Sequence, residues 1–220
     1  VQKISVRLGG RNVLNNLSFQ ASRGEIIAIA GVNGAGKSTL ARMLCGLQKN
    51  GSGTVLWAGK PMSRRLRRKK AYMVMQDVGH QLFTDSVAAE CALGIKTPNK
   101  VEIDRALEKV DLLAYKERHP LSLSGGQMQR LAVVVSEICG KELLVFDEPT
   151  SGLDLKSMEE IGTLTRSLAT QGKVLLIITH DIEFMMRICT RILFIRDGEI
   201  VKDLSGGQKE KIVRLLRGEE

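Results

Sequence analysis

Aromatic residues and long apolar runs are scarce in this sequence. Only 4% of the 220 residues are aromatic although 43% are hydrophobic, so Val, Ile and Leu must supply most of the core. Buried parallel strands favour these side chains. No apolar run approaches the roughly 18 residues that a membrane-spanning helix needs, and the N-terminus shows no signal-peptide pattern. The missing run excludes a transmembrane helix. Because the chain begins at Val1 rather than Met, we expect an excised domain or a processed chain.

Closely spaced cysteines are also absent. Cys45, Cys91, Cys139 and Cys189 lie far apart and form no C-x-x-C motif. This spacing argues against a zinc site and against a disulfide framework. Most of the four stand in apolar, helix-like surroundings, so we interpret them as reduced core residues of a cytosolic protein.

Acidic residues are outnumbered, and the net charge is +9. Much of the excess lies in residues 64–70, RRLRRKK, which carry six positive charges. Such a run can contact nucleic acid or an anionic membrane surface. No aromatic residues interleave it, so we favour a solvated helix face.

The stretch 26–40, IIAIAGVNGAGKSTL, contains the pattern G-x-x-x-x-G-K-[ST] at residues 31–38. An apolar strand over 26–30 would aim a loop whose glycines let backbone N–H groups turn toward phosphate oxygens. A helix that begins near Lys37 adds its positive end. Lys37 can reach the β- and γ-phosphates and the Ser38 hydroxyl can bind Mg²⁺. The loop therefore predicts a nucleoside triphosphate site.

Strand and helix patterns alternate along the chain, which predicts an α/β fold with a mainly parallel sheet covered on both faces. An antiparallel hairpin is expected over 2–8 and 13–20. Further strands are expected over 25–30, 54–58, 71–75, 143–146, 174–179, 192–196 and 199–202. Helices are expected over 37–47, 64–70, 84–93, 101–113, 124–139, 155–169, 182–189 and 208–216.

The chain is expected to form one domain, 1–220, with a small inserted part. Residues 77–140 are predicted to form a helical lobe. Residues 1–76 and 141–220 are predicted to form the P-loop core together with an antiparallel β subdomain. Only 46 residues separate Gln76 from Leu123, so the lobe must be small.

Polar residues follow several of the predicted strands. Asp147 and Glu148 end the strand 143–146, Gln76 ends the strand 71–75, and His180 follows the strand 174–179. Ligands of open α/β sheets bind at these carboxyl ends. We expect Asp147 to hold hydrated Mg²⁺, Glu148 to activate the attacking water, and His180 to contact the γ-phosphate. The amide oxygen of Gln76 can reach the metal or the water.

Residues 123–127, LSGGQ, offer a second anion-binding helix end. The predicted lobe separates this segment from the phosphate loop. Two copies that face each other head to tail would bring the segment of one copy to the nucleotide of the other. The simpler interpretation is an N-cap followed by a flexible glycine pair. A second SGGQ at 205–208 is interpreted as the N-cap of the last helix.

With these motifs in order, the chain resembles the nucleotide-binding subunit of an ATP-binding cassette (ABC) transporter. Residues 31–38 match Walker A, Gln76 the Q-loop, 123–127 the signature, 143–148 Walker B, 151–154 the D-loop, and His180 the switch histidine. The resemblance implies an Mg²⁺-dependent ATPase that pairs with a second cassette, on the cytoplasmic face of a membrane. It implies nucleotide contacts from Gly31, Asn33, Gly34, Ala35, Gly36, Lys37, Ser38 and Thr39, and metal contacts from Ser38, Gln76 and Asp147. It implies catalytic roles for Lys37, Glu148 and His180, and contacts in trans from Ser124, Gly125, Gly126, Gln127 and Asp154.

The segment 75–90 is similar to the ATPases of energy-coupling factor importers, including the cobalt-transport group. It contains Gln81-Leu82-Phe83 followed by Ser86-Val87 and Glu90. In that family this segment contacts the membrane coupling protein, so the resemblance implies uptake of a vitamin or a metal ion. The alternative for Leu82 and Phe83 is packing within the helical lobe.

The family usually has an aromatic residue before the first hairpin turn, where it stacks on adenine. Here that position is Leu8, with Arg7 beside it. We expect Leu8 to pack on the base by apolar contact or Arg7 to stack on it.

Other cassette machines remain as alternatives: a soluble ATPase that acts on nucleic acid or ribosomes, or half of a tandem-cassette protein. The compact lobe argues against a DNA-repair cassette, which usually carries a long coiled-coil insertion. Glu148 argues against a non-catalytic regulatory cassette. We therefore expect a membrane partner rather than nucleic acid.

Overall fold

The computed structural model describes residues 1–205, 208, 211 and 214. Apart from these single residues, the helix expected over 208–216 and the cap expected at the second SGGQ lie outside the described residues. None of the helices in the described part is long and apolar enough to cross a membrane.

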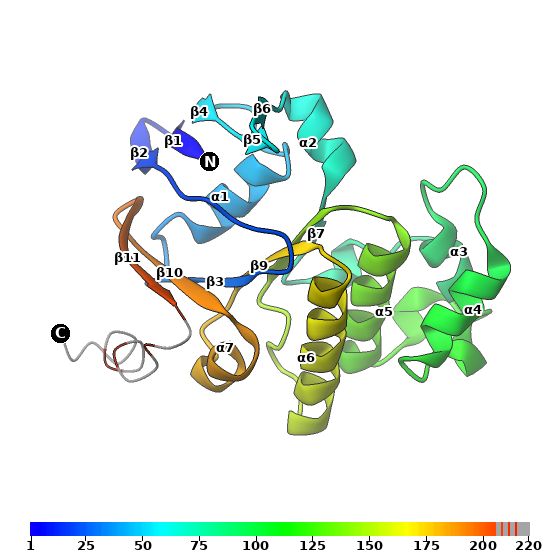
Figure 1. The fold of residues 1–220 in the computed structure, drawn as a ribbon. Coiled ribbons are helices and arrows are strands. Elements are labelled where there is room, and N and C mark those ends of the chain that lie inside the picture. Colours follow the sequence, from blue (N-terminus) through cyan, green and yellow to red (C-terminus); the bar gives the residue numbers. More distant parts are fainter. Residues whose placement is uncertain (206–207, 209–210, 212–213, 215–220) are drawn as a thin grey trace.

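A six-stranded sheet forms the centre of the fold (Figure 1). Its strand order is β11-β10-β3-β9-β8-β7, and only the β10–β11 pair is antiparallel. The strands are β3 (Ile26–Ala30), β7 (Ala71–Val74), β8 (Leu143–Asp147), β9 (Val174–Ile178), β10 (Arg191–Arg196) and β11 (Glu199–Ser205). Every residue of β3, β8 and β9 is buried, as expected of central parallel strands. The predicted α/β class is confirmed.

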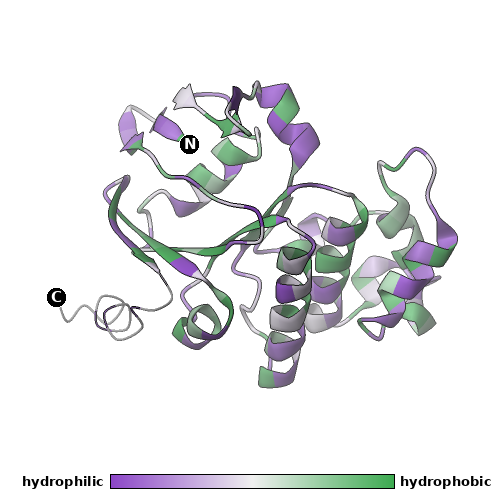
Figure 2. Ribbon diagram, in the orientation of Figure 1, coloured by the Kyte–Doolittle hydropathy of each residue, from purple (hydrophilic) through white to green (hydrophobic). Residues whose placement is uncertain are grey.

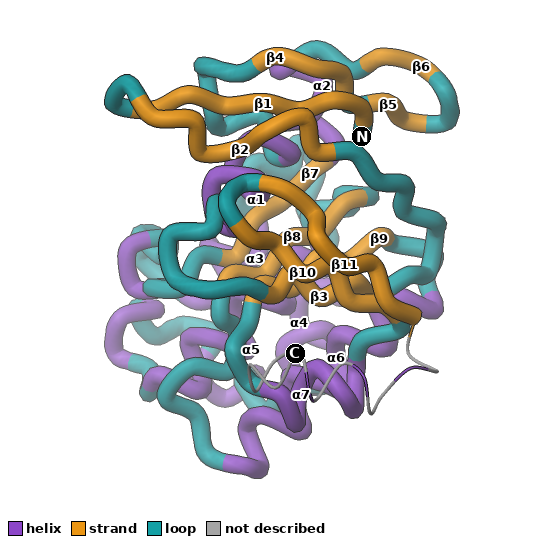
Figure 3. Tube along the Cα trace, turned by 90° about the vertical axis from the view of Figure 1, so that its left-hand side faces the viewer, coloured by secondary structure: helices purple, strands orange, loops and turns teal. Residues whose placement is uncertain are grey.

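The remaining strands, β1, β2, β4, β5 and β6, form two small antiparallel sheets in a separate layer on one side of this sheet (Figure 3). β1 (Gln2–Leu8) lies between β2 (Arg11–Leu17) and β4 (Ser52–Thr54), and β5 (Leu56–Trp57) pairs with β6 (Lys60–Pro61). The prediction of one strand over 54–58 was wrong. The segment is divided at Val55, because Ser52–Thr54 pair with β1 whereas Leu56–Trp57 pair with β6, so the partner strand changes there.

Helices cover both faces of the sheet. α1 (Lys37–Leu44) lies between the sheet and the antiparallel layer, while α5 (Gly125–Ile138), α6 (Leu155–Thr170) and α7 (Ile182–Ile188) cover the opposite face (Figure 1). α1 ends three residues earlier than predicted, since Gly46 follows with φ +71. Apolar colour follows the central strands, whereas α2 (Arg64–Lys70) is mostly hydrophilic (Figure 2).

The helical lobe contains α3 (Val87–Ala92), α4 (Lys100–Glu108) and the short 3₁₀ turns η1 (Val78–His80), η2 (Leu113–Tyr115) and η3 (Pro120–Ser122). Its core also includes Leu131 and Val134 of α5, whereas Ala132 and Val133 of the same helix pack toward the sheet. Because α5 belongs to both cores, the boundary at residue 140 stays a prediction.

The basic run forms the predicted helix α2, capped by Ser63. Two of its cations have structural partners. Arg67 is 8% exposed and its guanidinium donates to the carbonyl of Met43, near the negative end of α1. Lys70 pairs with Glu142 and lies 5.2 Å from the centre of the Trp57 ring. Part of the run therefore holds α2 onto the core.

Candidate nucleotide-binding site

The loop between β3 and α1 needs glycine for steric reasons. Gly31 has φ +146, and a Cβ atom there would lie 2.1 Å from the carbonyl oxygen of Ile195. Gly36 caps α1 with φ +101, and a Cβ atom there would lie 2.7 Å from the carbonyl oxygen of Val13. A side chain at either position would collide with backbone. The loop can therefore keep this close path against β10 and β2 only with glycine at these positions.

Lys37 begins α1 and folds back over its own loop. Its Nζ donates to the carbonyl oxygens of Gly31 at 2.7 Å and Val32 at 3.1 Å. Burial lowers the pKa of this ammonium, and the nearby carboxylates of Glu148 and Asp147 oppose that shift. The arrangement holds one positive charge against the backbone of the loop.

Asp147 ends β8 opposite Ile178 of β9, and it is 8% exposed. Burial raises the pKa of its carboxyl group, while a side-chain hydrogen bond with Ser38 and the charges of Arg42 and Lys37 oppose the shift. The Ser38 hydroxyl at the start of α1 and the Asp147 carboxylate at the end of β8 therefore lie within hydrogen-bond reach of each other. Their predicted role as ligands of one metal stays a prediction.

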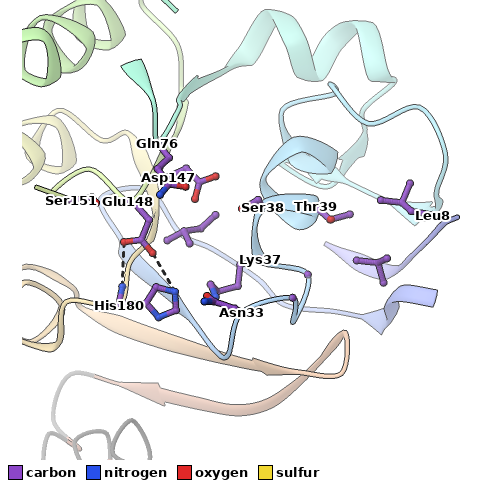
Figure 4. A pocket seen from close by; sticks show the side chains of 14 residues that line it. Leu8, Asn33, Lys37, Ser38, Thr39, Gln76, Asp147, Glu148, Ser151 and His180 are labelled. Atoms are coloured by element: carbon purple, nitrogen blue, oxygen red, sulfur yellow. Dashed lines mark hydrogen bonds and ion pairs between the residues drawn. The ribbon is translucent and has the colours of Figure 1, made fainter. Parts of the chain in front are cut away.

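Glu148 follows in a left-handed conformation, φ +51, which costs energy for any residue with a Cβ atom. Its amide donates to the carbonyl of Ile178 at 2.8 Å. Its Oε1 lies 3.4 Å from Nε2 of His180, and its Oε2 accepts the backbone N–H of His180 at 3.4 Å (Figure 4). The strained turn thus directs the second carboxylate toward β9 rather than along β8.

These groups line one cavity of about 710 Å³ (Figure 4). Most predicted residues meet there: Leu8, Asn33, Gly34, Gly36, Lys37, Ser38, Thr39, Gln76, Asp147, Glu148 and His180. Gly31 and Ala35 shape the same loop, and Ala35 is buried beneath it. Arg7 lies over the hairpin turn, where its Nε donates to the carbonyl of Gly10 at 2.9 Å.

Sequence reasoning missed three lining residues, which are Val13, Ser151 and Ile178. Val13 joins Leu8 at one end of the cavity because β1 and β2 pair antiparallel across the turn. A signal was present in the hairpin, since residues that flank a turn lie close together. Ser151 belongs to the motif at 151–154, of which only Asp154 was given a role.

The signature residues lie apart from this cavity. Ser124 caps α5: its Oγ accepts the amide of Gln127 at 3.4 Å, and Oε1 of Gln127 accepts the amide of Ser124 at 2.9 Å. Ser124, Gly126, Gln127 and Asp154 line a second cavity of about 550 Å³, and Gly125 lies in the same turn. A hydrogen bond from the amide of Ser157 lowers the pKa of Asp154, which caps α6. The predicted site residues therefore line two separate cavities of the described structure.

Fold and site together define a P-loop nucleotide-hydrolysing domain. The family model described as "ABC transporter" matches residues 14–151. A "Putative ABC transporter ATP-binding protein" of Treponema denticola is 58% identical over 212 residues, covering 96% of this chain and 43% of that protein. A protein of the same description from Streptomyces avermitilis is 36% identical over 208 residues, covering 90% of this chain and 78% of its own length.

Solved structures agree with these relatives. The ATP-bound bacterial Atm1-family ABC exporter has a TM-score of 0.82 at 26% identity, covering all of this chain and 39% of that chain. Clostridium perfringens cbiO1 is described as part of the ABC transporter complex cbiONQ. It has a TM-score of 0.81 at 28% identity, and the match covers 99% of this chain and 94% of cbiO1. The chain belongs to the ABC transporter family, as one of its ATP-binding cassettes and an ATPase. It spans 43% and 39% of the length of two Treponema denticola relatives.

Proposed function

We propose that the chain powers a membrane importer of the energy-coupling factor type, for a vitamin or a metal ion, from the cytoplasmic face of the membrane. The carrying observation is Phe83, which is 69% exposed although its neighbour Leu82 is 1% exposed within the lobe core. Glu90 fixes this contrast, because its buried Oε2 accepts the amides of Phe83 and Thr84 at 3.1 and 3.0 Å. An aromatic ring held outward by a buried carboxylate suits a protein contact.

The two solved neighbours differ in what they support. The Atm1-family structure is an exporter, and its cassette matches as well as that of cbiO1. The similar TM-scores therefore favour neither direction of transport. The segment 75–90 and the description of cbiO1 as part of cbiONQ support the importer type.

The donor set fits Mg²⁺. Ser38, Gln76 and Asp147 line the same cavity and offer a hydroxyl, an amide and a carboxylate oxygen, and Mg²⁺ prefers such hard oxygen ligands. A few protein ligands are enough, because Mg²⁺ usually completes its coordination with water molecules and with phosphate oxygens of the substrate. Bound Mg²⁺ would neutralise charge on the β- and γ-phosphates.

In the proposed reaction, the loop amides and Lys37 hold the β- and γ-phosphates. Glu148 accepts a proton from the water whose oxygen attacks the γ-phosphorus, and the bond to the β–γ bridging oxygen breaks to give ADP and phosphate. His180, 3.4 Å from Glu148, orients that carboxylate and reaches the γ-phosphate. Desolvation by a closing partner strengthens each of these interactions.

The separate halves support a two-cassette site. We propose that Ser124 to Gln127 and Asp154 of one cassette face the phosphate loop of another, head to tail. The second cassette is either an identical chain or part of a longer protein. The Treponema denticola relatives are more than twice as long as the matched segment, which supports the tandem alternative.

Nucleic acid is the rival partner, and the basic run is its candidate footprint. Of the six cations, Arg67 and Lys70 have internal partners, which leaves a smaller exposed set on a seven-residue helix. The two functions are separated by testing whether the protein co-purifies with membranes or instead binds nucleic acid in a salt-sensitive way.

Replacing Phe83 with Ser should release the cassette from its membrane partner, with ATP affinity unchanged. Losing an exposed aromatic anchor of an interface typically costs about 2 kcal/mol or more, or roughly thirtyfold in affinity. Co-purification from detergent-solubilised membranes measures this. The matched control is Val101→Ser, which removes a 66% exposed apolar residue of α4 on the same lobe. Equal retention of both variants would contradict the proposed docking face.

Replacing Leu8 with Tyr should tighten ATP binding by about two- to tenfold, because an aromatic pair adds roughly 0.5–1.5 kcal/mol beyond burial. Leu8 is 37% exposed and lines the cavity beside Val13, so a ring has room to stack there. Titration calorimetry of both proteins measures the change. A large loss of affinity in Leu8→Tyr would mean that the base binds elsewhere. Arg7→Ala tests the other candidate for contact with the base, the side chain that lies over the hairpin turn.

A further inference from the structure

Gln76 stands on a short loop that follows an end strand of the sheet. In the described part of the chain, β7 pairs with β8 on one edge and with no strand on the other. An unpaired strand edge frays unless other groups satisfy its N–H and C=O groups. Gln76 is exposed two residues after the strand ends, so its position depends on how that free edge is held.

The side chain of Gln81 holds the edge. Its Nε2 donates to the carbonyl of Met73 at 3.0 Å, and its Oε1 accepts the amide of Met75 at 3.0 Å. Groups two residues apart on a strand point to the same edge, so the carboxamide binds where a neighbouring strand would bind. The pairing extends past Val74, the last residue of β7, as far as Met75.

The second N–H of the carboxamide is also used. Nε2 of Gln81 donates to the hydroxyl of Tyr72 at 2.8 Å. The Tyr72 ring packs against both the sheet core and the lobe core. Both amide protons and the oxygen of Gln81 therefore have partners, and the side chain is tied to the junction between core and lobe.

The backbone around Gln81 is fixed as well. Its own amide donates to the carbonyl of Val78 at 3.0 Å, and the next residue, Leu82, is 1% exposed in the lobe core. Residues 75–81 thus form a loop closed at both ends, with Gln76 inside it. Gln76 faces the same cavity as Ser38 and Asp147.

We infer that Gln81 is a positioning residue for the metal site, because its carboxamide completes the free edge of β7 and so sets the place of Gln76. The inference rests on the proposed role of Gln76 toward Mg²⁺. Gln81 does not line the cavity itself and acts on it only through Gln76. Because Gln81 lies next to Leu82 of the lobe core, it also connects the cavity to the lobe that carries Phe83.

The test compares Gln81→Met with Gln76→Ala and with the double variant. Methionine keeps the length of the side chain and removes all three hydrogen bonds. We expect the amide of Met75 to exchange with solvent at least about tenfold faster, and Mg²⁺ to strengthen binding of a non-hydrolysable ATP analogue about three- to tenfold less than in the wild type. Affinity without Mg²⁺ should change less than about twofold.

Two further variants separate positioning from general structure. Gln171→Met makes the same change at the end of α6, where Gln171 donates to Glu137 at 3.2 Å, and it should leave the Mg²⁺ effect unchanged. Tyr72→Phe removes one of the three bonds and should give a smaller effect than Gln81→Met. In the Gln76→Ala background, Gln81→Met should cause no further loss of the Mg²⁺ effect.

The possible failures are distinguishable. If Gln76→Ala weakens the Mg²⁺ effect and Gln81→Met does not, the inference about Gln81 is overturned while the proposed metal ligand stands. If Gln76→Ala leaves the Mg²⁺ effect intact, the metal role of Gln76 fails and the inference falls with it. Additive losses in the double variant would show that Gln81 acts on the fold and not through Gln76.

Discussion

Replacing Glu148 with Gln should reduce ATP hydrolysis by about 10²- to 10⁴-fold, the usual contribution of a general base. The amide oxygen of Gln can still accept the backbone N–H of His180, and the amide nitrogen can donate to Nε2 of that residue. The left-handed turn at Glu148 is unchanged, so the cavity keeps its shape. Only the capacity to accept a proton from water is lost. Binding of ATP, and any ATP-dependent dimerisation, should remain.

Single-turnover hydrolysis and size-exclusion chromatography with ATP measure the two effects. The control is Glu142→Gln, which makes the same chemical change outside the cavity, at a partly buried ion pair with Lys70 that Arg23 also joins. It should leave turnover within about twofold, because Glu142 does not line the cavity that holds Glu148 and His180. Unchanged turnover in Glu148→Gln would rule out Glu148 as the base.

A mixture of Ser124→Arg and Lys37→Ala chains should be active although each variant alone is inactive. In a head-to-tail dimer, each site combines the phosphate loop of one copy with the signature segment of the other. A mixed dimer therefore has one site with both changes and one site with neither. With random pairing and independent sites, recovery should reach about a quarter of the wild-type rate.

The structure explains why each change is local. Lys37 supplies the charge at the loop, while Ser124 lies at the second cavity and caps α5 through the amide of Gln127. Loss of the cap costs about 1 kcal/mol, so circular dichroism must confirm folding. Ser122→Arg, two residues earlier on η3, is the control for added charge and bulk. No recovery on mixing, or two fully active sites, would contradict the head-to-tail arrangement.

Residues close in the sequence could be assigned before the structure because their roles depend on local geometry. The loop 31–38 is defined by spacing, and the structure supplies the reason, since Gly31 and Gly36 approach backbone of β10 and β2 too closely for a Cβ atom. The Ser124 cap was the simpler of the two interpretations of residues 123–127, and it too is a local feature. The split of the predicted strand 54–58 was not expected, because the change of partner strand at Val55 depends on tertiary pairing rather than on strand propensity.

The sequence by itself determined the chemistry of this protein: which side chains are available to hold phosphate, metal and water, and that the chain is an ABC cassette. The tertiary structure decided which of them meet. Glu148 and His180 are 32 residues apart and touch because β8 and β9 pair in one register, with Asp147 opposite Ile178. Leu82 and Phe83 are neighbours, yet one is buried and the other exposed. Gln81 gains its role only from the free edge of β7. Such contacts depend on how distant segments pack, and a pattern of residue types along the chain does not contain that information.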